Sequence, residues 1–186
     1  MTKPKGYVIY DGPSRLDEKP IIAILTLESK NVKTGNMAQL WIMARDKMPH
    51  IAKKNGNDSS VCGNCPIKEG CYVDLSKAPL SVWNSFHRGI YPAIQWGKTD
   101  LSQYFIRYGA YGDGAALPLW IISALARNAR DFTGYTHQWK RFKSMNKFFM
   151  ASVESEKLAI QAQSRGFRTF RVRQPGAELL PGEIEC

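Results

Sequence analysis

The sequence lacks any long apolar run, and this absence excludes a transmembrane helix. A helix that spans a bilayer needs about 20 consecutive apolar residues, and no stretch of the 186-residue chain approaches that pattern. The chain also begins without the apolar segment of a secretory signal, since Met1–Lys5 leads directly into the strand-like Tyr7–Tyr10. We therefore expect a protein of the cytoplasm.

Several catalytic and nucleotide-binding motifs are also missing. The chain contains no GxGxxG, no P-loop, no HExxH and no Ser-His-Asp order, so it has no fingerprint for a dinucleotide, a nucleoside triphosphate or a metalloprotease. Four cysteines in a chain expected in a reducing compartment argue against a disulfide framework. Clustered cysteines in such a chain are more often metal ligands or catalytic residues.

Acidic residues are scarce: 16 Asp and Glu stand against 26 Lys and Arg, which gives a net charge of +10. Residues 127–173 alone contain eleven Lys and Arg against three acids. Such an excess favours polyanionic partners, nucleic acid first, although a solvated surface is the alternative. The candidate nucleic-acid residues are Arg107, Arg127, Arg130, Tyr135, Trp139, Lys140, Arg141, Lys143, Lys147, Arg168, Arg171 and Arg173.

The hydrophobic pattern predicts an α/β fold in one domain, residues 1–186. Residues 20–27 and 37–43 are apolar and β-prone and predict an N-terminal hairpin, after a short strand at 7–10. From residue 104 strands and helices alternate, which predicts parallel strands joined by crossover helices. The expected architecture is a hairpin followed by βα repeats, as a partial (β/α) barrel or a small, mostly parallel sheet. Residues 175–186 are an irregular tail.

The most specific feature is a cysteine loop at residues 55–75. Cys62 and Cys65 form a CxxC, and Cys71 follows within six positions, with Gly63 and Gly70 beside these ligands. Thiolates are soft ligands for zinc or for an iron–sulfur cluster, and a CxxC directs two sulfurs at one metal. Lys68 lies nearby and is expected to lower the thiol pKa values. The alternative is three free thiols packed as small hydrophobic side chains.

The spacing leaves the metal and its fourth ligand open. A [4Fe-4S] cluster and a structural zinc both suit the three thiols. By chemistry Cys186 is the first candidate for the fourth ligand, followed by His50 and His87. The spacing differs from the C-x3-C-x2-C of radical SAM enzymes and predicts no such chemistry.

Three polar residues stand at predicted strand ends, where α/β folds bind their ligands. Asp113 follows one strand among glycines, His137 follows the next in a stretch that mixes aromatic and basic residues, and Glu154 follows a third. Acid–base catalysis is one interpretation of all three. The alternatives are a helix-starting Asp113, a first-turn helix charge at Glu154, and Tyr135 and Trp139 as core aromatics.

The segment Cys62-Gly63-Asn64-Cys65-Pro66-Ile67-Lys68-Glu69-Gly70-Cys71-Tyr72 resembles the cysteine signature of small bacteriophage proteins of the gene-product-eighty-eight type. The stretch from Arg107 to Asp113 and the order of elements after it also resemble that family. The resemblance covers roughly residues 61–186 and rests mainly on the cysteine segment. It implies a phage protein in the host cytoplasm and supplies no settled activity.

Three functions follow as hypotheses. The first is a metal- or iron–sulfur-binding phage protein that associates with nucleic acid or with a nucleic-acid machine of the host. The second is a nucleic-acid-modifying enzyme that uses Asp113, His137 and Glu154. The third is an inhibitor of a host defence system, such as an anti-CRISPR, whose basic surface docks on an acidic or RNA-containing site.

Overall fold

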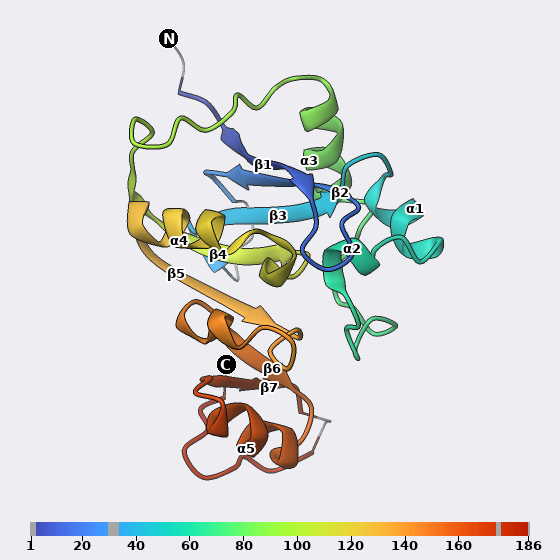
Figure 1. Cartoon of the computed structure of the whole chain (residues 1–186), viewed down its shortest axis with the longest axis vertical. Helices are drawn as coiled ribbons and strands as arrows, with labels where there is room; N and C mark the ends of the chain where they lie inside the picture. The colour runs from blue at the N-terminus through green and yellow to red at the C-terminus, as the bar shows by residue number, and fades with distance from the viewer. Residues whose placement is uncertain (1–2, 30–33, 174–175, 186) are drawn as a thin grey trace.

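The fold is built on one mixed sheet of seven strands in the consecutive order β1-β2-β3-β4-β5-β6-β7 (Figure 1). The structure is a computed structural model that describes residues 3–29, 34–173 and 176–185. Because each strand pairs with its neighbour in the sequence, the chain winds in one direction across the sheet. β1 and β7 are the two edges, and the sheet does not close into a barrel.

The first three strands form an antiparallel meander: β1 (Gly6–Pro13), β2 (Pro20–Thr26) and β3 (Ala38–Ala44). β2 holds five consecutive buried residues, Ile21 to Leu25. Such a run on both faces is what a central strand needs when side chains cover it from either side. The predicted hairpin of residues 20–27 and 37–43 is therefore confirmed, as is the short strand before it.

The remaining strands are parallel: β4 (Leu101–Tyr111), β5 (Ala129–Thr136), β6 (Met150–Val153) and β7 (Thr169–Arg171). α4 (Leu119–Asn128) connects β4 to β5, and α5 (Glu156–Ser164) connects β6 to β7. Between β5 and β6 the chain forms only a 3-10 helix, η3 (Lys143–Lys147). The predicted α/β class, with a hairpin followed by parallel strands, is confirmed.

The long connection from β3 to β4 carries three helices, α1 (Pro49–Lys54), α2 (Ser59–Cys62) and α3 (Ala78–His87). Proline stands in the first turn of α1 and α3, where its missing N–H costs nothing. The cysteine loop follows α2 directly. Figure 1 shows α1 and α2 beside one end of the central strands, so this insertion lies at the strand ends and not along an outer strand.

Local capping sets the start of two helical segments. The Ser155 side chain accepts a hydrogen bond from the Leu158 N–H at the start of α5. The Asp113 side chain does the same for the Ala115 N–H at the 3-10 helix η2 (Gly114–Ala116). Across the described ranges, no helix is both long and apolar enough to cross a membrane.

Candidate functional site at the carboxyl ends of the parallel strands

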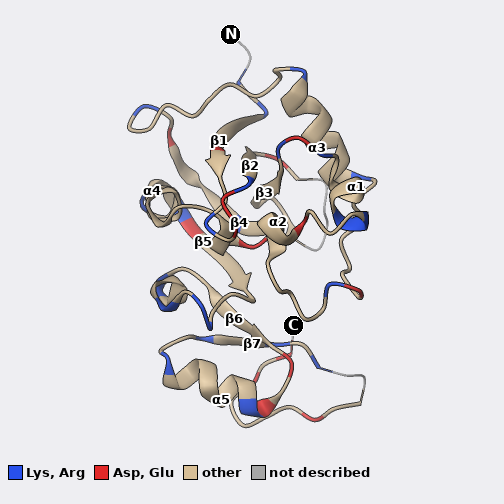
Figure 2. Cartoon of the chain, turned by 45° about the vertical axis from the view of Figure 1, so that its right-hand side comes forward, with Lys and Arg blue, Asp and Glu red and all other residues tan. Residues whose placement is uncertain are grey.

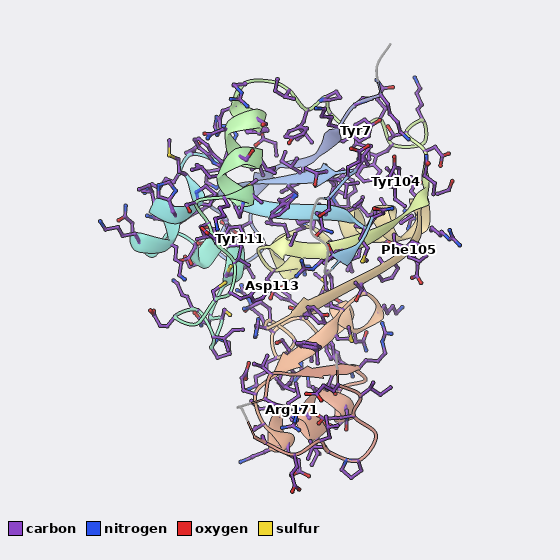
Figure 3. The ribbon with its side chains drawn as sticks, turned by 180° about the vertical axis from the view of Figure 1, so that it is seen from behind. Tyr7, Tyr104, Phe105, Tyr111, Asp113 and Arg171 are labelled. Carbon is purple, nitrogen blue, oxygen red and sulfur yellow. The ribbon has the colours of Figure 1, made fainter. Side chains whose placement is uncertain are left out.

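Asp113, His137 and Glu154 lie at the same end of the parallel strands. Asp113 comes two residues after β4, His137 follows β5 directly, and Glu154 follows β6 directly. Because these strands are parallel, their carboxyl ends lie side by side. Open α/β sheets bind their ligands at this end of the strands. Figure 3 shows Tyr111 and Asp113 where the end of β4 meets the segment that carries the cysteine loop.

The cysteine loop reaches the same strand ends and contacts His137. The Sγ atom of Cys65 lies 3.6 Å from Nδ1 of His137, although 72 positions separate the two residues. The other ring nitrogen, Nε2, lies 3.6 Å from Oε1 of Glu154. Cys65, His137 and Glu154 therefore form a row in which the imidazole faces a thiol on one side and a carboxyl on the other.

Burial sets the protonation of this row. It lowers the pKa of His137 and raises the pKa of Glu154 and of the Cys65 thiol, because each charged form loses hydration. Nε2 of His137 and Oε1 of Glu154 are both buried, and neither has a hydrogen-bond partner among the described residues. At 3.6 Å the two atoms lie slightly beyond hydrogen-bond distance.

Asp113 serves as an acceptor for the backbone of the site. Its Oδ1 accepts the Ala115 N–H at 2.9 Å, and its Oδ2 accepts the His137 N–H at 2.8 Å. The Asp113 side chain is almost fully buried, and burial raises its pKa to about 6, although these hydrogen bonds favour the charged form. Asp113 thus holds His137 in place, and the helix-starting alternative is also correct for it.

Three contacts anchor the cysteine loop to the sheet. The Asp113 N–H donates to the Val61 carbonyl at 2.9 Å. The Gln138 amide donates to the Cys62 carbonyl at 3.0 Å. Gly63 has φ +58° beneath that amide, and a Cβ there would lie 2.6 Å from Gln138 Nε2, so only glycine fits.

Lys68 interacts electrostatically with Cys62 but does not control the thiol pKa. Its Nζ lies 2.6 Å from Oδ1 of the buried Asp58, so its charge is committed to that ion pair. The pKa of Cys62 is raised by burial first, and then by the charges of Asp113 and Asp58. The expected lowering of the thiol pKa values is therefore not the net result at Cys62, because burial and the nearby carboxylates outweigh the charge of Lys68.

The three cysteines are close enough to interact electrostatically and form no disulfide. The charges of Cys65 and Cys71 add to the raised pKa of Cys62, and that of Cys71 adds to the raised pKa of Cys65. Within the described ranges no three His, Cys, Asp or Glu side chains are arranged to hold a metal ion. Cys186, the expected fourth ligand, lies outside the described residues.

Three thiols and an imidazole are the ligand types of a thiolate metal centre. One pair of these ligand atoms also has the separation that such a centre requires. With metal–sulfur and metal–nitrogen bonds of about 2.3 and 2.0 Å, two ligands of a tetrahedral zinc stand roughly 3.5 Å apart. The Cys65–His137 separation of 3.6 Å matches this value. Cys62 and Cys71 would have to move toward the same point, and Gly70 allows the backbone before Cys71 to adjust.

The two histidines expected as ligands lie elsewhere. His87 Nε2 is 3.0 Å from the Arg45 carbonyl oxygen, and the His87 ring packs on Trp83. His50 lines a separate cleft beside α1. The imidazole that reaches the cysteines is His137, which the sequence indicated only as an acid or base. Its position after a parallel strand was the available signal.

One of the two aromatic residues expected to stack on bases, Trp139, belongs to the core. Trp139 is 3% exposed, donates from Nε1 to the Ser152 carbonyl and packs on Phe167, so its assignment to a nucleic-acid surface is wrong. Tyr135 is half-buried against Phe170, with ring centroids 4.3 Å apart. The core-aromatic alternative therefore describes Trp139, because the end of β5 must cover the apolar space beneath β6.

The basic residues of 127–173 are also distributed differently from expectation. Arg171 forms a two-pronged ion pair with Glu183, and Arg173 pairs with Glu185, so the tail neutralises both. Arg141 donates to the Leu16 carbonyl. Figure 2 shows Lys and Arg spread over α1, α5, β7 and the connections between strands. The members that are exposed are Arg127, Arg130, Lys140, Arg141, Lys143, Lys147, Lys157 and Arg168.

Comparison with known proteins adds no assignment to this site. No family model matches the chain, and no curated protein and no solved structure matches it either. The resemblance of residues 62–72 to the gene-product-eighty-eight type of phage protein therefore stays a prediction.

Proposed function

We propose that the cysteine loop and His137 form a thiolate metal centre, occupied by zinc or by a [4Fe-4S] cluster, in a phage-type protein that associates with nucleic acid or a host nucleic-acid machine. Cys62, Cys65 and Cys71 would hold the metal with His137. The supporting observation is the Cys65–His137 separation of 3.6 Å with two further thiols in electrostatic contact. A zinc ion would stabilise the folded loop, whereas an iron–sulfur cluster would also give the protein a redox-active centre.

The surroundings of His137 support a ligand role. A histidine that binds a metal through one nitrogen usually donates its other N–H to a carboxylate, which fixes the ring orientation. Here Nδ1 faces Cys65, and Nε2 faces Glu154 Oε1 at 3.6 Å. Asp113 holds the His137 backbone, and Gln138 holds the Cys62 carbonyl. The chain therefore supplies both the donors and the groups that orient them.

Metal analysis of anaerobically purified protein, with its absorption spectrum, tests this proposal. A colourless protein with one zinc per chain, or broad visible absorption with several irons per chain, supports it. Cys65→Ser and His137→Ala should each lower the metal content, whereas Cys186→Ser should keep it. Metal retained in His137→Ala but lost in Cys186→Ser would overturn the assignment of His137, and metal-free wild-type protein would overturn the centre itself.

A second candidate is a thiol-dependent enzyme, which the same row of side chains favours. Cys65 would be the nucleophile, His137 the base that takes its proton, and Glu154 the group that orients the imidazole. The raised pKa of Cys65 and the lowered pKa of His137 predict a neutral thiol–imidazole pair at rest. Alkylation of Cys65 in metal-free protein that is equally fast with and without His137 would exclude this role.

Association with nucleic acid is proposed from the net charge of +10. Phosphate contacts by Lys and Arg release counterions, so binding should weaken steeply as salt rises. Fluorescence anisotropy with labelled single- and double-stranded oligonucleotides measures this dependence. Absence of binding at low salt, together with a nuclease-resistant complex with a host protein, would favour the defence-inhibitor hypothesis instead.

A further inference from the structure

A basic cleft lies beside the cysteine loop, apart from the row at the strand ends. Its volume is about 560 Å³, and α1 forms one wall while residues 68–76 form the other. His50, Lys53 and Lys54 come from α1, and Lys68 comes from the cysteine loop itself. Figure 2 shows the basic end of α1 on the outer side of the molecule.

The positive charges of Lys53 and Lys54 in this cleft are available to a ligand. Lys53 and Lys54 make no ion pair with any residue that the structure describes, whereas Lys68 is held by Asp58. Two acids also line the cleft, Glu69 and Asp74, but Asp74 is bound to Lys77 and to Ser76. Two neighbouring ammonium groups without acidic partners form an attractive site for phosphate oxygens.

His50 lines the same cleft from α1. Its Nδ1 atom is buried and has no hydrogen-bond partner in the described parts of the chain. A buried polar atom without a partner costs free energy. An imidazole N–H is a suitable donor to a phosphate oxygen.

An exposed aromatic residue directly precedes the cleft residue Val73 in the chain. Tyr72 is 73% exposed and directly precedes Val73, which lines the cleft wall. Arg107 donates from Nη2 to the Tyr72 hydroxyl at 2.6 Å, which steadies the ring without covering it. Exposed aromatic rings beside a basic groove are how single-stranded nucleic acids are bound, since every base can stack on such a ring.

We propose that this cleft binds the phosphodiester backbone of a single-stranded nucleic acid, with Lys53, Lys54 and His50 on phosphate oxygens and Tyr72 stacked on a base. The proposal rests on the nucleic-acid association proposed above and locates it. It moves the contact surface from residues 127–173 to the insertion between β3 and β4. The strand would then pass alongside the cysteine loop, because Lys68 and Tyr72 belong to that loop.

Anisotropy with a labelled single-stranded oligonucleotide tests the cleft with a matched control. Lys53→Ala/Lys54→Ala removes the two unpaired ammonium groups, while Lys143→Ala/Lys147→Ala removes two exposed ammonium groups near β6. The cleft variant should raise Kd about tenfold or more and lower the salt slope by about 1.4, or 0.7 for each lost phosphate contact. The control should change Kd less than twofold, and Tyr72→Ala should weaken binding without changing the slope.

The outcomes separate failure of the cleft from failure of the broader proposal. If wild-type protein binds and both double variants weaken it equally, the cleft has no special role and this inference is wrong. If wild-type protein does not bind at all, nucleic-acid association itself fails. Displacement of the oligonucleotide by an equal concentration of a mononucleotide would identify the cleft as a small-molecule phosphate site and overturn the single-strand assignment.

Discussion

Asp113 is the residue that joins the sheet, the cysteine loop and His137. Its carboxyl accepts N–H groups from Ala115 and His137, and its own N–H donates to Val61 just before the first cysteine. The sequence placed Asp113 correctly at a strand end. Its role as a backbone acceptor depends on partners up to 24 positions away, which local pattern does not reveal.

At about pH 4, where the contribution of Asp113 is full, Asp113→Ala should lower the free energy of unfolding by about 2–4 kcal/mol, because it leaves several buried N–H donors without an acceptor. Urea denaturation of metal-free protein followed by circular dichroism measures the change. Asp46→Ala, at an exposed position, is the control and should change stability by less than about 0.5 kcal/mol. Equal stability of the two variants would contradict the assigned role of Asp113.

The raised pKa of Asp113 also predicts a pH dependence. The folded-state pKa is about 6 against an ordinary 3.8, so the folded protein binds more protons between these values than the unfolded chain does. The contribution of this group to stability is therefore full below about pH 4 and is lost as pH rises through 6. Denaturation of wild type and Asp113→Ala across this range should show the decline only in wild type.

At the scale of elements, α2 must approach the end of β4 closely to place the cysteine loop. Gly112 has φ +85°, and a Cβ there would lie 2.6 Å from the Ile42 carbonyl oxygen and 2.8 Å from Val61 Cγ1. Gly56 also has a positive φ, +69°, but a Cβ there would meet nothing within 4 Å. Substitution of the two glycines therefore distinguishes the cost of backbone strain alone from the cost of strain combined with a steric clash.

Gly112→Ala should destabilise the fold by more than about 2 kcal/mol, since it adds a steric clash to the strain of a left-handed backbone. Gly56→Ala, which adds only the strain, should cost about 1 kcal/mol. Thermal or urea unfolding of both variants measures the difference. A similar loss in both would show that the approach of α2 to β4 is not tightly packed.

The C-terminal tail is a second element whose position depends on charge. Arg171 on β7 holds Glu183 through two hydrogen bonds of 2.6 Å and lowers the pKa of that carboxyl to about 2. The ion pair is therefore intact above the ordinary pKa of 4.5 and is lost as pH falls through about 2. The tail is expected to stay on the sheet edge throughout the neutral range.

Glu183→Gln should release the tail at neutral pH, because a neutral amide cannot form the charged two-pronged contact. Faster amide hydrogen exchange and proteolysis within residues 177–185 measure the release. Glu178→Gln removes one acid from the same segment but leaves the Glu178 carbonyl that Arg171 contacts, so it is the control. Equal protection in both variants would show that the apolar tail residues alone hold the segment.

At the scale of the whole molecule, the sheet is continuous but unevenly joined. β2 and β3 are paired over six residue pairs, whereas β5 and β6 are joined by two. The β6–α5–β7 segment therefore depends on side chains such as Trp139 and Phe149 for its attachment. In Figure 1 this segment lies at one end of the molecule, beyond β5.

Native-state hydrogen exchange should distinguish the two ends of the sheet. Amides of β6 and β7 are expected to exchange through a partial opening, because few ladder hydrogen bonds attach them, while amides of β2 and β3 exchange only through global unfolding. Measurement against increasing denaturant gives the opening free energies. Identical values across the sheet would show that the seven strands unfold as one unit.

The sequence by itself determined the α/β class, the N-terminal hairpin and the alternation of parallel strands with helices after residue 104, because these follow from local apolar patterns and turn residues. It also placed three thiols in one loop and three polar residues at strand ends. Only the tertiary structure decided that His137 rather than His87 faces the thiols, that Trp139 is core, and that Glu183 and Glu185 cover Arg171 and Arg173. These contacts join residues far apart in the chain, so they depend on strand order, register and packing, which no local pattern specifies.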